Sequence, residues 1–351
     1  MTSDESFPAI GRVFRSVGLD AFAIAGRDLI EELGASSDPV ASGLYGLSSA
    51  AGAVVAAFPY DPYGGFDPGD AQDEGARDAE DRDAEDRDAG ARLEIGAFAA
   101  ANRYAALARL LRAAGRALSA EAGLPAAGFR SIVNSRLSEK RLASMAGLGF
   151  IGRSSLLVTE AYGPACVLGA LTLPPGFPLG TPARDAAGGA VEAPRRVGLP
   201  ARLTPGGGCG SCRACAEACP TGAIDRADGG PDLARCIQYW TARPGDVPEP
   251  VRAAWGRRLY GCDACVAACP RSAAASSPGE GGQSPAERAE ALLEPAERRP
   301  GRLVPASLFG SGDDGEIRAF LRKTALGMSW IGPAELRRNA AIADGQARYR
   351  I

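Results

Sequence analysis

The chain has 351 residues, of which 46% are hydrophobic, and a formal net charge of −3, so it is long enough for two or three domains with a sizeable core. Histidine is absent, which excludes imidazole acid–base chemistry and histidine ligands to zinc, haem or cobalt. The sequence starts without a basic or apolar leader and has no run of membrane-spanning length, which predicts a cytoplasmic protein with no membrane contact.

The first half of the chain has the pattern of a mixed domain of helices and strands. Short apolar runs predict strands at residues 21–25, 53–58 and 129–133. Residues 103–122 are rich in Ala and Leu, which predicts a helix that ends at Gly123. These segments favour the α/β or α+β class.

An acidic insert interrupts this pattern at residues 67–92. Residues 67–88 include eleven acidic residues and three arginines, and they contain a near-perfect tandem repeat of Ala-Glu-Asp-Arg-Asp. Such a segment cannot bury apolar surface, so we expect a solvated, disordered loop, with an electrostatic docking segment as the alternative. The rest of the chain is then mildly basic, which permits an anionic partner.

Shorter elements and a linker follow the long helix. Residues 139–146 are predicted to form a short helix, and residues 155–159 and 165–173 a pair of strands. The Gly- and Pro-rich residues 174–208 are expected to be a linker.

The last part of the chain is predicted to be a polar linker at 276–301 followed by helices near 316–326 and 334–343. The resulting division is an α/β domain over residues 1–200, a cysteine-rich domain over 201–275, and a linker with a short helical C-terminal segment over 276–351.

Nine cysteines in a reducing compartment are expected to be metal ligands rather than disulfide partners. Eight of them form the pattern Cys-x-x-Cys-x-x-Cys-x-x-x-Cys-Pro from Cys209 to Pro220 and Cys-x-x-Cys-x-x-x-Cys-Pro from Cys262 to Pro270, with Cys236 between. Two residues between ligands let a tight loop aim successive thiolates at neighbouring irons, and the Cys-Pro directs the fourth thiolate to the other cluster. The spacing predicts a bacterial-type, ferredoxin-like domain with two [4Fe–4S] clusters.

The same rule divides the eight ligands. One cluster is assigned to Cys209, Cys212, Cys215 and Cys269, and the other to Cys219, Cys236, Cys262 and Cys265. The alternative is two zinc sites with four cysteines each, but such sites need neither a third evenly spaced cysteine nor Cys-Pro. Cys166 lies in an apolar run outside both blocks and is expected to be a buried core thiol.

About 200 residues precede the cysteines, more than two clusters need, which favours an enzyme over a small electron carrier. Several segments resemble the epoxyqueuosine reductases, a family of cobalamin-dependent enzymes with two [4Fe–4S] clusters that is related to the reductive dehalogenases. Besides the cysteine blocks, the resemblance rests on Ala-Gly-Leu-Gly-Phe-Ile-Gly-Arg at 146–153, Arg-Leu-Tyr-Gly-Cys-Asp at 258–263, Ser-Trp-Ile-Gly at 329–332 and Leu-Arg-Arg-Asn-Ala-Ala-Ile-Ala at 336–343.

The resemblance implies a cobalamin-binding-like α/β domain, in which base-off cobalamin lies between that domain and the clusters. It also implies that electrons pass through the clusters to cobalt, which drives removal of an epoxide oxygen from a queuosine precursor in tRNA. The implied partners are tRNA and an electron donor such as a ferredoxin or flavodoxin. Arg337, Arg338, Arg348 and Arg350 are then candidate phosphate contacts.

The catalytic positions depart from the family pattern. The family places a proton-donating aspartate in Val-Asp-Ser-Ala-Pro, where this chain has Val133-Asn134-Ser135-Arg136-Leu137. Asn134 can form hydrogen bonds but cannot deliver a proton as a carboxylic acid does, so it is either a remnant of that position or a strand-end turn residue. Of the family's Asp-Tyr-His, only Tyr104 is present, as a candidate acid or a core aromatic.

Gly147, Gly149, Gly152 and Arg153 are candidates for contact with the corrin, although such glycines are also typical of tight turns. Three functions are then open. The first is an epoxyqueuosine reductase, the second a paralogue that reduces a different substrate with the same cofactors, and the third a non-catalytic two-cluster electron-transfer protein.

Overall fold

The structure is a computed structural model that describes residues 1–36, 45–64, 92–180, 206–224, 230–279, 281–327 and 331–348. The acidic insert predicted at 67–92 lies outside the described residues except for Arg92, which is the first residue of a strand and so does not belong to a loop. Residues 181–205 of the predicted 174–208 linker also lie outside them.

The larger sheet has four strands in the order β1-β2-β7-β4, and every neighbouring pair is antiparallel. The strands are β1 (Ala21–Gly26), β2 (Gly52–Pro59), β4 (Ser131–Val133) and β7 (Cys166–Leu173). Strands predicted at 21–25, 53–58 and 129–133 are confirmed, the last as its final three residues.

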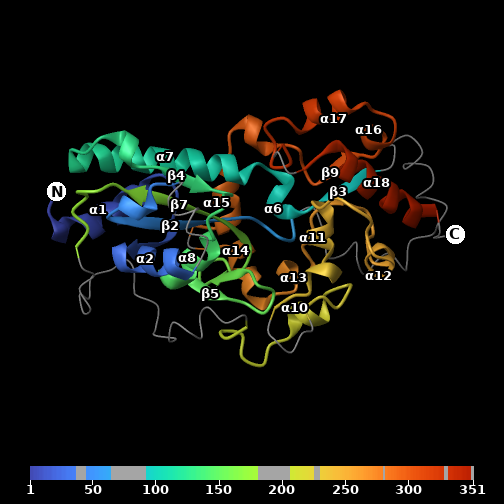
Figure 1. Cartoon of the computed structure of the whole chain (residues 1–351), viewed down its shortest axis with the longest axis horizontal. Helices are drawn as coiled ribbons and strands as arrows, with labels where there is room; N and C mark the ends of the chain where they lie inside the picture. The colour runs from blue at the N-terminus through green and yellow to red at the C-terminus, as the bar shows by residue number, and fades with distance from the viewer. Residues whose placement is uncertain are drawn as a thin grey trace.

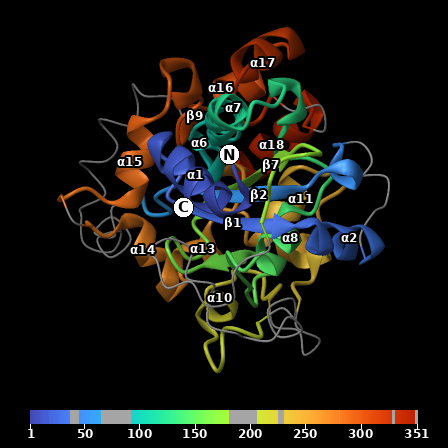
Figure 2. The ribbon, with the colours of Figure 1, turned by 90° about the vertical axis from the view of Figure 1, so that its left-hand side faces the viewer.

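Helices cover both faces of this sheet, as Figures 1 and 2 show. Helices α1 (Ser3–Ser16) and α7 (Arg103–Ala122) lie on one face, and α2 (Arg27–Ser36) and α8 (Glu139–Met145) on the other. Every residue of β2 is buried because successive side chains point to opposite faces. Val54 packs into the core under α1 and α7, whereas Val55 packs into the core under α2 and α8.

Helix α7 begins and ends where the sequence predicts. The Asn102 side chain accepts a hydrogen bond from the Ala105 backbone N–H at 3.2 Å, which satisfies one of the free amides of the first turn. At the other end Gly123 has a φ of 67°, a left-handed conformation that glycine adopts without strain and that ends the helix.

The predicted pairing of strands at 155–159 and 165–173 is wrong. Strand β6 (Leu157–Thr159) pairs with β5 (Gly149–Ile151) in a separate hairpin, while β7 belongs to the larger sheet. The hairpin closes because Gly152 N–H donates to the Leu156 carbonyl at 2.8 Å and Ser155 N–H donates to the Gly152 carbonyl at 2.9 Å.

A second sheet has the order β8-β3-β9 and joins distant parts of the chain. Its strands are β3 (Arg92–Ile95), β8 (Arg258–Tyr260) and β9 (Leu303–Pro305). Strand β3 is parallel to β8 and antiparallel to β9. The three-part division of the chain stays a prediction, and strands from all three parts meet in this sheet.

Besides β8, the described part of the cysteine segment has four short helices: α10 (Ala214–Glu217), α11 (Ile237–Thr241), α12 (Glu249–Ala253) and α13 (Ala264–Ala267). They lie beside the second sheet in Figure 1, with α6 (Ala97–Ala100) between the two sheets. Helices α16 (Ser307–Gly310), α17 (Asp314–Leu321) and α18 (Pro333–Arg348) complete this half of the molecule. The helices predicted near 316–326 and 334–343 are thus confirmed, the first shorter and the second longer.

The polar linker predicted at 276–301 is wrong, because this segment contains helix α15 (Pro285–Ala291) and the 3₁₀ turn η5 (Pro295–Arg298), after α14 (Ala273–Ser276). Ser284 and Glu287 form a capping box at the start of α15, with proline at the first helical position. Ala289 is buried in the core of the larger sheet.

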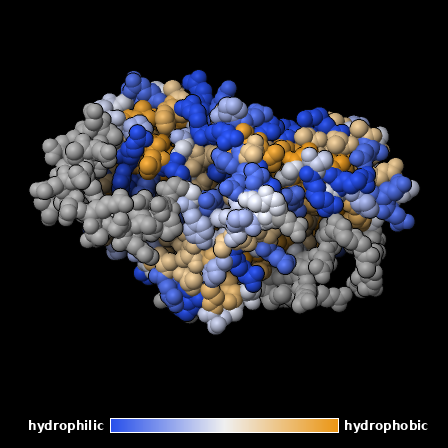
Figure 3. All heavy atoms as spheres, turned by 180° about the vertical axis from the view of Figure 1, so that it is seen from behind, coloured by the Kyte–Doolittle hydropathy of each residue, from blue (hydrophilic) through white to orange (hydrophobic). Residues whose placement is uncertain are grey.

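The helices of the described part include none long and apolar enough to cross a membrane. Hydrophilic side chains are spread over the face seen in Figure 3, with smaller hydrophobic areas between them. The predicted mixture of α and β structure is confirmed, with an antiparallel main sheet.

Candidate functional site

The seven cysteines of the two blocks lie in or beside two short helices, α10 and α13, which contact each other, and Cys236 directly precedes α11. Each of the two helices contains one cysteine, Cys215 or Cys265, and is followed shortly after its end by a Cys-Pro, so the two segments present their thiols in similar ways. The thiols separate into two groups according to which of them raise one another's pKa.

The first group consists of Cys209, Cys212, Cys215 and Cys269. Burial raises the pKa of Cys215, and the neighbouring Cys209, Cys269 and Cys212 raise it further. Burial also raises the pKa of Cys269, and Cys209 and Cys212 add to this effect. Cys212 is the one member of the eight that is exposed, so this group reaches the surface.

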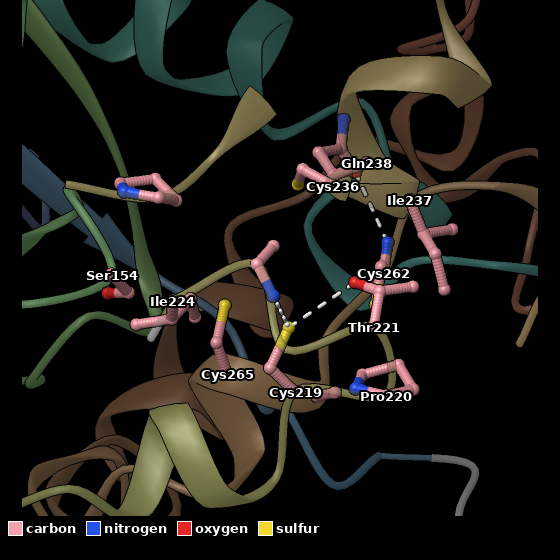
Figure 4. A pocket seen from close by; sticks show the side chains of 13 residues that line it. Ser154, Cys219, Pro220, Thr221, Ile224, Cys236, Ile237, Gln238, Cys262 and Cys265 are labelled. Atoms are coloured by element: carbon pink, nitrogen blue, oxygen red, sulfur yellow. Dashed lines mark hydrogen bonds between the residues drawn. The ribbon is translucent and has the colours of Figure 1, made fainter. Parts of the chain in front are cut away.

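The second group consists of Cys219, Cys236, Cys262 and Cys265, and it encloses a cavity of about 60 Å³. Figure 4 shows the four thiols around this cavity, with the apolar side chains of Ile224 and Ile237 in its wall. Burial raises the pKa of Cys265, followed by the effects of Cys262 and Cys236. Cys215 of the first group also raises the pKa of Cys265, so the two groups are neighbours.

Cys219 is the thiol best prepared to ionise. Burial opposes its charge, but hydrogen bonds from Thr221 and from the backbone N–H groups of Ala223 and Ile224 outweigh burial and lower its pKa. The Ala223 N–H donates to Cys219 Sγ at 3.3 Å, and the Thr221 hydroxyl lies 3.6 Å from the same sulfur. A thiolate is the form that binds iron, and such donors stabilise it.

The arrangement of the thiols fits a cluster better than a single ion. Within the described residues, which include all nine cysteines, no three Cys, Asp or Glu side chains lie close enough to hold one metal ion. A zinc site requires four thiolates about 2.3 Å from the same ion. Thiolates that bind the separate irons of a [4Fe–4S] cluster stand further apart.

A series of buried and half-buried polar residues leads away from the second group. Gln238 Oε1 accepts a hydrogen bond from the Cys262 N–H at 3.2 Å, and Gln238 is also hydrogen-bonded to the Tyr260 hydroxyl. Burial raises the pKa of Tyr104, and Tyr260 and then Glu139 raise it further. Tyr104 therefore lies between the cysteine side and the turn that precedes α8.

That turn carries Asn134, directly after β4. Asn134 has a φ of 49°, a left-handed conformation in which Asn is enriched among the non-glycine residues. Its side chain is half-buried and has no hydrogen bond to any described residue. The next residue, Ser135, donates from its backbone N–H and its hydroxyl to Glu139 Oε1, at 3.0 and 2.9 Å.

The glycine-rich segment 147–153 connects this side to the first cysteine group. A side chain at Gly149 would collide with the Val158 carbonyl across the β5–β6 hairpin, so the pairing of these strands requires glycine at this position. A Cβ at Gly152 would lie 3.8 Å from Cys209 Sγ. Arg153 donates to the Cys212 and Gly210 carbonyls, at 3.3 Å each, and so holds the first cysteine loop. Gly147, with a φ of 88°, ends helix α8.

The remaining candidates have other roles or lie outside the described side chains. Arg337 donates to Asp314 and to the Gly312 carbonyl, and Arg338 donates to the carbonyls of Trp240 and Arg243. Both guanidinium groups are therefore used inside the protein, not held free for phosphate. The Arg348 side chain and all of Arg350 lie outside the described part.

Cys166, at the start of β7, packs against the main core, and burial raises its pKa to about 12.

The residue that sequence reasoning missed is Glu139. Its sequence signal, an acid in the first turn of a short helix, is indistinguishable from an ordinary helix-capping glutamate.

Residues 208–272 match the family of 4Fe-4S double cluster binding domains, which confirms two [4Fe–4S] clusters as cofactors. The chain is 39% identical over 147 residues to the epoxyqueuosine reductase of Burkholderia pseudomallei (strain K96243), covering 41% of this chain and 32% of that protein. It is 27% identical over 224 residues to the epoxyqueuosine reductase of Staphylococcus aureus (strain NCTC 8325 / PS 47), covering 64% and 49%. The matches thus span a third to a half of those relatives.

Solved structures are similar over almost the whole chain. The epoxyqueuosine reductase of Streptococcus thermophilus superposes with a TM-score of 0.64 at 20% identity, covering 97% of this chain and 81% of that one. An epoxyqueuosine reductase from Bacillus subtilis, with its aspartate-bearing catalytic loop swung out of the active site, has a TM-score of 0.61 at 21% identity over 97% and 81%. A third, bound to an epoxyqueuosine-modified tRNA-Tyr stem loop, has a TM-score of 0.63 at 22% identity over 97% and 80%. The resemblance to this family is confirmed, and the fold is shared.

Proposed function

We propose that this chain is a reductase that removes the epoxide oxygen of epoxyqueuosine in tRNA, using electrons delivered by its two [4Fe–4S] clusters. The observation that carries the proposal is that the two sets of four cysteines are neighbours. The second set is connected by interactions of Gln238, Tyr260 and Tyr104 to the turn that carries Asn134. The epoxyqueuosine reductases that share the fold, including one bound to a modified tRNA stem loop, supply the substrate class.

In this proposal each thiol group holds one cluster. Cys209, Cys212, Cys215 and Cys269 ligate the outer cluster, which receives electrons at the exposed Cys212 edge from a donor such as a ferredoxin or flavodoxin. Cys219, Cys236, Cys262 and Cys265 ligate the inner cluster around the 60 Å³ cavity. Cys215 and Cys265 lie between the two, so electrons pass from the outer cluster to the inner one there.

The residues around Tyr104 fit a corrinoid between the α/β part of the chain, which is then cobalamin-binding-like, and the inner cluster. The chain has no histidine, so no histidine side chain would hold the corrinoid. The half-buried Asn134 amide, which has no partner among the described residues, and the Gly147–Arg153 segment are the groups that would hold it. When bound, the corrinoid supplies the two-electron chemistry at cobalt.

The protein's own residues position the substrate and provide protons. Removing the oxygen of an epoxide to leave an alkene consumes two electrons and two protons and releases water. The clusters supply the electrons, so an acid near residue 134 must supply a proton to the departing oxygen. Proposed in the same way are a cytoplasmic location and tRNA as the partner.

One observation favours a second candidate, a paralogue with the same cofactors and another substrate. Asn134 occupies the position of the family's aspartate, and its amide cannot donate a proton as an acid. The two candidates separate when the gene is expressed in a strain that lacks its own epoxyqueuosine reductase. Queuosine in the tRNA of that strain supports the first candidate, whereas epoxyqueuosine that persists despite an iron-loaded protein contradicts it.

A further inference from the structure

The carboxyl group of Glu139 folds back onto the turn that carries Asn134. Glu139 is the first residue of α8, and its Oε1 accepts both hydrogen bonds from Ser135, the residue directly after Asn134. The position of the carboxyl is therefore fixed by the same turn that presents Asn134.

Glu139 also interacts electrostatically with a residue on the side of the cofactors. Its charge raises the pKa of Tyr104, at the start of α7. Tyr104 in turn interacts with Tyr260, which is linked to the inner thiol group through Gln238. Glu139 thus lies at the end of the chain of residues that starts at the cysteines.

Its second oxygen is available to carry a proton. Both hydrogen bonds from Ser135 reach Oε1, and Oε2 has no partner among the described residues. Oε2 is not one of the polar atoms of the described part that are buried without a partner.

The charged and titratable neighbours do not neutralise this carboxyl. Lys140, beside it on α8, donates instead to the Ser155 carbonyl at 2.8 Å. Tyr45 faces the same turn, where its hydroxyl accepts from the Arg136 backbone N–H at 3.3 Å, and Tyr104 faces it from α7. Burial raises the pKa of Glu139, against the hydrogen bonds from Ser135 and from its own backbone N–H.

The other groups near the turn are poor acids. Histidine is absent from the chain, the Asn134 amide does not ionise, and burial raises the pKa of Tyr104 above its ordinary value. A carboxylic acid that keeps its proton at higher pH is the remaining group suited to protonate a leaving oxygen.

We propose that Glu139 donates the proton to the departing epoxide oxygen, in place of a carboxyl group at position 134. This inference rests on the proposed function. The proton moves from Glu139 Oε2 to the oxygen as the first carbon–oxygen bond breaks. A second proton from solvent completes the water as the second carbon–oxygen bond breaks and the alkene forms; the clusters supply the two electrons, and Glu139 regains its proton from solvent.

The test compares variants of the reconstituted holoenzyme on an epoxyqueuosine-modified stem loop. Glu139→Gln keeps an oxygen that accepts from Ser135 but removes the acidic proton, and its turnover is expected to fall roughly 100-fold or more. Asn134→Asp combined with Glu139→Gln is expected to recover a substantial part of that loss, because it restores a carboxyl to the turn. Glu287→Gln is the matched control, since the Glu287 carboxyl accepts from the Ser284 backbone N–H at the start of another helix, α15, and its turnover should equal that of the wild type.

The pH profile gives a readout that a purely structural role would not move. Wild-type kcat/KM should fall as pH rises through the raised pKa of Glu139, and this limb should disappear in Glu139→Gln while iron content and the cluster spectrum stay unchanged. Full activity of Glu139→Gln, or a loss that Asn134→Asp does not relieve, overturns the role of Glu139 alone. A wild-type holoenzyme that leaves the stem loop unreduced overturns the proposed function together with this inference.

Discussion

At the scale of single residues, the sulfur of Cys219 is set apart from the other thiols by its donors. Thr221 and the backbone of Ala223 and Ile224 lower its pKa although burial opposes this. Hydrogen bonds to cluster sulfurs favour the more negative, reduced cluster and so raise its reduction potential. The Thr221 hydroxyl is therefore a positioning and tuning group for the inner cluster.

Replacing Thr221 by Val removes that hydroxyl donor and keeps the shape of the side chain. We expect the reduction potential of one cluster to become more negative, with the other cluster unchanged, in a titration followed by electron paramagnetic resonance. Thr324→Val is the control, because it removes a hydroxyl that donates to the Leu321 carbonyl and not to a cysteine sulfur. Leu321 belongs to the core beside the second sheet. Equal potentials in wild type and Thr221→Val would refute the tuning role.

Sequence reasoning identified the residues whose spacing alone constrains the chemistry. The spacing of the eight cysteines predicts which four bind each cluster. Asn134 and Tyr104 were found through the family resemblance, in a turn and at the start of a helix. Glu139 could not be singled out, because its burial depends on α2, β1 and β2, which pack against α8 from distant parts of the chain.

At the scale of elements, α7 is attached to the segment 294–298 by a charged contact. Arg109 donates to Glu297 through Nε at 3.1 Å and Nη2 at 2.7 Å, and its Nε lies 3.2 Å from Glu294. Burial would raise the pKa of Glu297, but the hydrogen bonds from Arg109 and Glu294 outweigh it and lower the pKa below 4.5.

This contact makes a prediction for acid stability. A carboxyl whose pKa is lower in the folded state stabilises the fold above its unfolded-state pKa, and this contribution is lost as pH falls through the folded-state value. We expect the free energy of unfolding of Glu297→Gln to fall less steeply than that of wild type below about pH 4.5. Denaturant titrations at several pH values measure this, and parallel curves would contradict it.

Helix α18 is joined to the cysteine half by a buried amide. Asn339 is fully buried, and its Nδ2 donates to the Thr241 and Leu259 carbonyls at 2.9 Å each. Asn339→Ala leaves two buried carbonyls without a donor, so the free energy of unfolding should fall by about 2–4 kcal/mol. Arg322→Ala, an exposed neighbouring substitution, should change it by less than about 0.5 kcal/mol. A similar small loss in both would show that the amide is not needed.

The elements that sequence reasoning placed correctly carry their signals locally. Helix α7 has its cap Asn102 and its terminating Gly123 in the sequence, whereas α15 was hidden because its charged residues resemble a solvated linker. The partner of β6 was predicted wrongly, because which strand pairs with which depends on the hairpin turn at Gly152.

At the scale of the whole molecule, the chain passes several times between the larger sheet and the second sheet. Strands β3, β8 and β9 come from three distant parts of the sequence and form one sheet. Composition and periodicity cannot reveal such contacts, because each strand is only three or four residues long. Figure 1 shows helices α10 and α13 of the cysteine segment between the larger sheet and the second sheet.

The central claim is that electrons from two clusters end in the removal of an oxygen atom from a modified nucleoside. The most direct measurement is mass spectrometry of an epoxyqueuosine-modified stem loop after anaerobic incubation with the reconstituted, cobalamin-loaded protein and a chemical reductant. We predict a product that has lost one oxygen atom, formed by protein that holds about eight irons. An unchanged stem loop after incubation with fully loaded protein, or a protein that retains zinc in place of iron, would contradict the account.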